Sequence, residues 1–289
     1  AICAGVVLLI PLSPVLIFGF GPIPALGIAG GGVAVLLTTA LTGAGLAWYL
    51  WSGRSVVHPK LSRLRKALFV DILRVGAVGS INTLQTTLVM VLTTAIVGAA
   101  GGPDAVAGYG TGARLEYLLI PLVFGLGAPL VALVGTNIGA GQRSRALRIA
   151  LIGGALAFAM TEAVGVTAAI WPHAWLGLFA NDHAVLETGG AYLRIVGPTY
   201  GFFGLGLVLY FASQGAGKLF WPLLSSFARL VIAIGAGWLA FRLTGSLTAL
   251  FASLALGLVV YGVSLVLAIR TGVWFERDQR FRPARTSAG

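Results

Sequence analysis

The stretch from Tyr109 to Arg148 reads YGTGARLEYLLIPLVFGLGAPLVALVGTNIGAGQRSRALR and decides the fold of this chain. After Arg114 and Glu116 near its start, it is apolar as far as Val134, and roughly 20 apolar residues are enough for an α-helix to cross a bilayer. Glycines and a turn rich in arginine follow. Because basic residues stay on the cytoplasmic side of a membrane protein, the stretch predicts a transmembrane helix that runs from the outside to the cytoplasm.

The composition of the whole chain agrees with a membrane protein. Of its 289 residues, 58% are hydrophobic and 9% are charged, whereas soluble domains carry about 25% charged residues. The formal net charge of +11 would suit nucleic acid, but the basic residues are spread over short turns and do not form one face. We therefore expect the lipid bilayer as a partner and no nucleic acid. The single cysteine, Cys3, excludes an internal disulfide and a cysteine metal site.

Further apolar segments of membrane-spanning length lie on both sides of this helix, and together they predict an all-α polytopic bundle of about eight transmembrane helices. We expect the first segment to be broken by Pro11 and Pro14. Between the segments we expect turns, among them GGPD at 101–104 and a loop at 171–187. The predicted spans are 2–20, 27–51, 69–100, 109–134, 146–171, 185–213, 219–241 and a last one that ends near Ile269.

The distribution of charge gives this bundle an orientation. With the helix after Tyr109 running inward, most of the 19 lysines and arginines fall in inward turns or in the tail. Arg242 is the one basic residue expected in an outward turn, and Asp104, Asp182 and Glu187 lie in outward turns. This bias predicts a multi-pass protein of the plasma membrane (a bacterial inner membrane) with both termini in the cytoplasm.

Several motifs resemble the multidrug and toxic compound extrusion (MATE) family. LVGTNIGAGQRSRA at 133–146 is similar to the end of that family's eighth helix. VLIFGFGPIPALGIAGGGVAV at 15–35 resembles the junction of the fifth and sixth helices, and SQGAGKLFWPL at 213–223 resembles the turn between the tenth and eleventh. The resemblance runs from Ile2 to about Arg270 with the motifs in order, and it implies helices five to twelve of twelve.

The resemblance implies two six-helix lobes, a repeat plan common among transporters. We expect residues 1–53 to be the last two helices of an incomplete N-terminal lobe, and residues 54–68 to be a basic cytoplasmic linker. Residues 69–270 would then form a complete six-helix C-terminal lobe, followed by a cytoplasmic tail at 271–289. The chain begins inside an apolar segment without an initiator methionine, so we expect a fragment of a longer protein, with the missing N-terminal helices as its partner.

The same resemblance implies a secondary active transporter that exports amphipathic or cationic small molecules in exchange for protons or sodium ions. No organic cofactor and no enzymatic activity are expected. Two alternatives remain open: a flippase for a lipid-linked glycan, for which arginines within spans would meet a diphosphate, and an inactive fragment. A membrane-embedded enzyme would need a cluster of acids or histidines at the cytoplasmic face, and the sequence shows no such cluster. No metal site is expected, because His58, His173 and His183 have no metal-ligand spacing.

Charged residues inside the spans are the first candidates for a transport pathway, because each costs about 2.5–3.5 kcal/mol within a bilayer on insertion scales. At about 1.5 Å per residue, four of them reach a similar depth, and we expect an ionic network that either clamps the helices or exchanges a proton or cation. Arg229 has no obvious acidic partner, which favours a structural role bound to a carbonyl or a helix end. The four network candidates are Arg114, Glu116, Glu162 and Arg194.

Uncharged polar residues in the spans are further candidates to line a cavity, although such residues more often hold helices together. They are Asn82, Gln85, Tyr200 and Gln214. The sequence departs from the family at its second-lobe cation site, because the expected tenth-helix carboxylate falls near Phe203, and at LSP (12–14), where the family pattern has LDP. The coupling ion and the substrate therefore stay open.

Overall fold

The computed structural model describes residues 2–20, 24–53, 66–272 and 274. Their regular elements are helices, and the chain divides into two compact units, 1–69 and 70–289. Most of the expected basic linker, nearly all of the expected tail, and His58 lie outside the described residues. The all-α membrane class predicted from the composition is confirmed.

The first unit contains a helical hairpin of α1 (Ile2–Phe18) and α2 (Ile28–Trp51). The amides of Leu26 and Gly27 donate to the carbonyls of Leu16 and Ile17, each at 3.1 Å, which closes the turn. The expected break at Pro11 and Pro14 is wrong, because α1 continues through both. Membrane helices accept proline where local adjustment and neighbouring groups satisfy the freed carbonyls.

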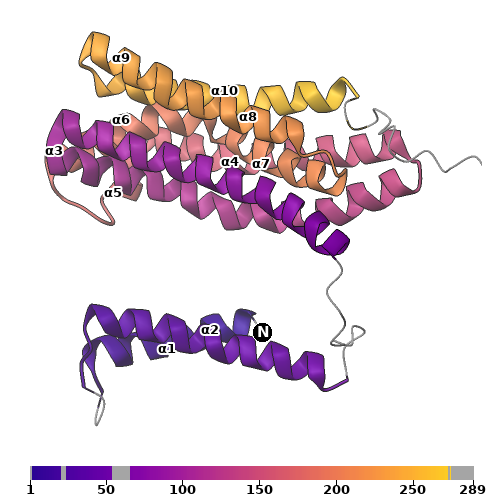
Figure 1. Cartoon of the computed structure of the whole chain (residues 1–289). Helices are drawn as coiled ribbons and strands as arrows, with labels where there is room; N and C mark the ends of the chain where they lie inside the picture. The colour runs from indigo at the N-terminus through magenta and orange to yellow at the C-terminus, as the bar shows by residue number, and fades with distance from the viewer. Residues whose placement is uncertain (1, 21–23, 54–65, 273, 275–289) are drawn as a thin grey trace, which may run out of the picture. The chain divides into compact units, whose positions relative to one another are not determined.

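The second unit begins within α3 (Lys66–Gly139), which contains two arms joined at a sharp reversal. Gly102 has φ +69 and ψ −160, a conformation that glycine adopts at little steric cost. The expected GGPD turn thus contracts to one residue, because Pro103 already starts the second arm, where its missing N–H is tolerated. The arms, 66–101 and 103–139, return side by side (Figure 1), and the Tyr117 hydroxyl donates to Met90 Sδ at 2.7 Å.

The remaining helices of the second unit include two broken spans. One runs through α6 (His183–Val196), the 3₁₀ turn η1 (Gly197–Thr199) and α7 (Tyr200–Gly215). The other runs through α8 (Phe220–Leu230), the π-helical segment η2 (Val231–Ala236) and α9 (Gly237–Thr244). The unbroken helices are α4 (Arg143–Ile170), the short α5 (Pro172–Leu176) and α10 (Leu247–Arg270).

Within the described ranges, six helical stretches are long and apolar enough to cross a membrane. One of them, Gly79–Gly139, contains the second arm of α3 and residues 79–101 of the first. The expected loop at 171–187 is wrong in part, because His173 lies in α5 and His183 begins α6. The Asp182 side chain accepts from the Ala184 amide at 2.9 Å, so it caps α6. Local capping of this kind extends a helix beyond the apolar window that sequence hydropathy detects.

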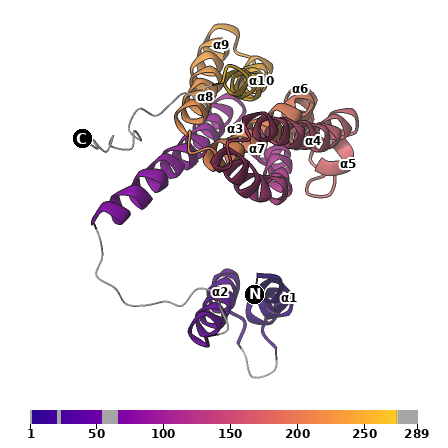
Figure 2. The same ribbon diagram turned by 90° about the vertical axis from the view of Figure 1, so that its right-hand side faces the viewer.

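Small residues bring α4 and α7 into close contact, and Figure 2 shows the two helices side by side. A Cβ added to Gly204 on α7 would lie 2.3 Å from Thr161 Oγ1 on α4, and one added to Gly165 on α4 would lie 2.1 Å from the Gly197 carbonyl oxygen in η1, just before α7. Membrane helices associate through this kind of close backbone packing, because lipid provides no hydrophobic drive between them. The pair therefore forms a tight side of the second unit.

Candidate functional site

A cavity of about 460 Å³ opens within the second unit, between the two arms of α3, α7, α8 and α10. Its walls combine apolar and aromatic side chains with a few polar groups, the composition of most small-molecule sites. Three of the residues predicted from the sequence, Asn82, Gln85 and Gln214, line this cavity. Its aromatic wall is made of Phe124, Phe203, Tyr210, Phe211 and Tyr261.

Two polar groups of the α3 wall differ in how they are satisfied. The Ser226 hydroxyl on α8 donates to Asn82 Oδ1 at 2.6 Å, which links α8 to the first arm of α3. Gln85 is only 7% exposed, yet its Oε1 accepts no hydrogen bond from the described residues. A buried acceptor without a partner is costly, so the Gln85 carbonyl is available to a hydrogen-bond donor in the cavity.

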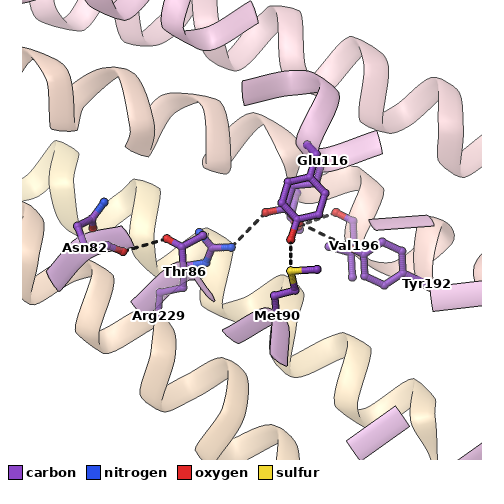
Figure 3. A network of polar contacts seen from close by, with 9 residues as sticks. Asn82, Thr86, Met90, Glu116, Tyr192, Val196 and Arg229 are labelled. Carbon is purple, nitrogen blue, oxygen red and sulfur yellow. Dashed lines mark hydrogen bonds and ion pairs between the residues drawn. The ribbon is translucent and has the colours of Figure 1, made fainter. Parts of the chain in front are cut away.

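Arg229 and Glu116 form an ion pair at one end of this cavity (Figure 3), with Nη2 of the guanidinium 3.1 Å from Oε1 of the carboxylate. Their side chains are 13% and 20% exposed. The Tyr192 hydroxyl donates to the other carboxylate oxygen at 3.3 Å. Partners on α6 and α8 therefore hold this carboxylate of α3 inside the bundle, where a lone charge would be costly.

The guanidinium of Arg229 lies on the cavity side of this ion pair. Its Cζ is 5.7 Å from the centroid of the Phe203 ring and 5.8 Å from that of Tyr261, and both rings line the cavity. Glu116 does not line it and instead contacts a separate small void of about 30 Å³ that Arg229 also borders. Arg229 thus separates Glu116 from the larger cavity.

The predicted network of Arg114, Glu116, Glu162 and Arg194 does not form as an ionic cluster. Glu116 pairs with Arg229, so the expectation that Arg229 lacks an acidic partner is also wrong. No ion pair joins the four predicted residues to one another within the described part of the chain. Equal depth did not bring them together because residues two apart on a helix, such as Arg114 and Glu116, point to different faces.

The two predicted arginines, Arg114 and Arg194, lie apart from each other and from the cavity. Arg114 is exposed, with its Cζ 5.7 Å from the Phe179 ring centroid. Arg194 is also exposed and borders a pocket of about 430 Å³ together with His173 and His183. Neither arginine lines the cavity between α3 and α8.

Glu162 on α4 stabilises the broken span that contains α6, η1 and α7. Its Oε2 accepts from the Gly201 amide at 2.7 Å, just after the 3₁₀ turn. The first amides of a helix have no partner within that helix, and Pro198 in the turn has no amide proton to offer. The carboxylate therefore caps α7 from α4.

Tyr200, the last predicted candidate, is fully buried but does not line the cavity. Its hydroxyl makes no hydrogen bond with the described residues.

The sequence alone places Arg229 within a span, but the identity of its partner depends on which faces of α3 and α8 meet. Among the described residues, no group of three or more His, Cys, Asp and Glu side chains could hold a metal ion.

Comparisons with known proteins show which family the chain resembles. The MatE family model matches residues 80–239, which is more than half of the chain. A FAD transporter of Shewanella oneidensis is 30% identical over 214 residues, which cover 70% of this chain and 44% of the relative. The probable multidrug resistance protein YoeA of Bacillus subtilis is 28% identical over 222 residues, which cover 74% of this chain and 47% of that protein.

The fold is also found among solved structures. An outward-facing multidrug resistance MATE family transporter of the MOP superfamily aligns with a TM-score of 0.82 at 23% identity. The alignment covers 92% of this chain and 60% of the other. The chain spans about half the length of the curated relatives it matches.

Proposed function

This chain belongs to the MatE family, and we propose that it forms part of a secondary transporter that exports amphipathic or cationic small molecules in exchange for protons or sodium ions. Members of the family are transporters and not enzymes, and the chain is a multi-pass membrane protein. The cavity of about 460 Å³ carries the proposal, because it offers aromatic rings and amide groups inside the bundle. A relative named as a probable multidrug resistance protein adds support.

We assign Glu116 as the coupling group and the cytoplasm as the location of both termini. Glu116 is a carboxylate held inside the bundle by Arg229 and Tyr192, and intramembrane carboxylates commonly serve proton relays. No organic cofactor is needed, because the gradient of the coupling ion drives such transport. The orientation rests on the bias of basic residues toward one set of turns.

A second candidate is the transport of a flavin nucleotide. One relative is named a FAD transporter, and Arg229 is the one charged side chain among the described residues that line the cavity. An anionic ligand would meet this guanidinium, and its ring system would meet the aromatic wall. The flippase alternative draws less support, because Arg114 and Arg194 do not line the cavity.

The test is export of ethidium from a drug-sensitive host that expresses the gene. Leu207 lines the cavity from α7, so Leu207→Trp should fill part of it and reduce export at least fivefold at equal protein level. Glu116→Gln should abolish the dependence of export on the proton or sodium gradient. Leu256→Trp is the matched control, because Leu256 is exposed on α10 and lies away from the cavity.

Export of ethidium at the rate of the empty host would count against the multidrug function. Equal export by wild-type protein and Leu207→Trp would contradict the assignment of the cavity as the substrate site. Coupled export that survives Glu116→Gln would remove Glu116 from the coupling role.

A further inference from the structure

The charge that faces the cavity has the opposite sign to the one a cation site needs. Arg229 contributes its guanidinium to the wall, and no aspartate or glutamate is among the described residues that line the cavity. The nearby carboxylate of Glu116 lies on the far side of Arg229, next to the smaller void. A cation in the cavity would therefore meet the guanidinium before it could meet the carboxylate.

The guanidinium of Arg229 also has N–H donors that make no hydrogen bond among the described residues. Arginine carries five N–H donors, and only the bond from Nη2 to Glu116 is found among the described residues. The Phe203 and Tyr261 rings lie near the guanidinium and line the same cavity. Arginine in such a position is suited to planar, bidentate recognition of carboxylate, sulfonate or phosphate groups.

We propose that the cavity binds planar aromatic ligands that carry an anionic group, and that this group competes with Glu116 for the guanidinium of Arg229. The inference rests on the second function proposed above, in which the cavity is the substrate site. The aromatic wall would hold the ring system, Arg229 would bind the anion, and the unpaired Oε1 of Gln85 would accept a donor from the ligand.

The competition links the ligand to a proton. When Glu116 takes up a proton, its carboxyl loses its charge, and Arg229 is released toward the cavity. Anion binding and protonation of Glu116 then favour each other, and this linkage is reciprocal. A proton therefore binds together with an anionic substrate. In the exchange proposed for cations, the proton and the substrate would instead displace one another.

The experiment uses three naphthalene probes that share one ring system and differ in charge. They are 2-naphthalenesulfonate, 2-naphthaleneethanol and (2-naphthylmethyl)trimethylammonium, and the sulfonate does not titrate in the range tested. Binding to the protein in nanodiscs is measured by calorimetry in buffers of different ionisation enthalpy, which reports the protons taken up per ligand. Empty nanodiscs correct for partition of the probes into lipid.

We expect the sulfonate to bind at least tenfold more tightly than the trimethylammonium probe, with uptake of up to one proton, and more tightly as the pH falls. Glu116→Gln should bind the sulfonate tightly at every pH without proton uptake. Arg229→Gln should lose at least tenfold for the sulfonate and keep its affinity for the neutral alcohol. Arg229→Lys should keep part of the preference, because it keeps the charge and loses the bidentate geometry.

Arg242→Gln is the matched control, because Arg242 is an exposed arginine near the end of α9 and away from the cavity. Preference for the trimethylammonium probe, with loss of its binding in Glu116→Gln, would overturn the inference and leave the cation exporter standing. Equal binding of all three probes, unchanged in Arg229→Gln, would overturn the inference and keep the cavity as a site. If none of the probes binds, both the inference and the assignment of the cavity fail.

Discussion

One face of α7 packs tightly against α4, and the other face lines the cavity. Toward α4, Gly201 and Gly204 bring the backbones together, and an added Cβ at Gly204 would meet Thr161 at 2.3 Å. Toward the cavity, the same helix presents Phe203 and Phe211. Residue size is one difference between the two faces: glycines let α7 approach α4 closely, whereas large rings on the other face line the cavity.

The two faces also differ in how their polar groups are satisfied. At the tight face, the carboxylate of Glu162 on α4 accepts a hydrogen bond from the Gly201 amide at the start of α7. On the cavity side, Gln85 has a carbonyl oxygen without a partner, and Arg229 has one hydrogen bond from a group with five donors. The first arrangement fixes a packing, whereas the second leaves groups for a ligand to satisfy.

The largest effect is expected where the tight face is broken. In Gly165→Val the new side chain would enter the space of the Gly197 carbonyl, since even a Cβ would lie 2.1 Å from its oxygen. Overpacking against backbone should destabilise the fold by about 3 kcal/mol, seen as a lower unfolding temperature in detergent. Gly125→Val, in open space on α3, is the control. An unchanged melting curve for Gly165→Val would show that the interface is loose.

A smaller effect is expected from breaking the ion pair beside the cavity. Arg229→Leu leaves the partly buried Glu116 carboxylate without its cation, which should cost about 2 kcal/mol. The double variant Arg229→Leu with Glu116→Gln should recover more than half of that loss, because no unpaired charge remains. Thermal unfolding of the wild-type protein, both single variants and the double variant gives the coupling energy. Additive losses would mean that the pair contributes nothing to the packing of α3 against α8.

The smallest effect is expected at the cap of α7. Glu162→Leu leaves the Gly201 amide unpaired and should cost about 1 kcal/mol, whereas Glu162→Gln keeps an acceptor and should cost less. Hydrogen exchange at the Gly201 amide, followed by mass spectrometry, should be faster in Glu162→Leu and close to wild type in Glu162→Gln. Equal exchange rates in all three proteins would remove Glu162 from the capping role.

Much of the fold followed from local pattern. Apolar length predicted the spans now seen in α2, α4 and α10, and the run before Gly102 and the run after it became the two arms of α3. The errors are also local. Pro11 and Pro14 do not interrupt α1, and α5 forms within a segment expected to be a loop. Hydropathy averages over a window, so it cannot detect a five-residue helix. The general rule that proline breaks helices does not tell which membrane helix tolerates it.

The candidate site was only partly predictable. Asn82, Gln85 and Gln214 were selected because they are polar residues in or near apolar runs, and all three line the cavity. The partner of Glu116 was not found, because Arg229 is 113 residues away in the sequence. Depth along a helix can be counted from the sequence, but the direction in which a side chain points around the helix axis depends on packing.

The sequence by itself determined the all-helical membrane class, the resemblance to a transporter family and the polar residues that the spans contain, because these depend on composition, run length and local motifs. Only the tertiary structure decided which of those residues meet. It paired Glu116 with Arg229, assigned Glu162 to the cap of α7, and left Arg114 and Arg194 outside the cavity. The physical reason is that contacts between helices depend on how each helix is rotated about its axis, and small residues distributed over the whole bundle set that rotation.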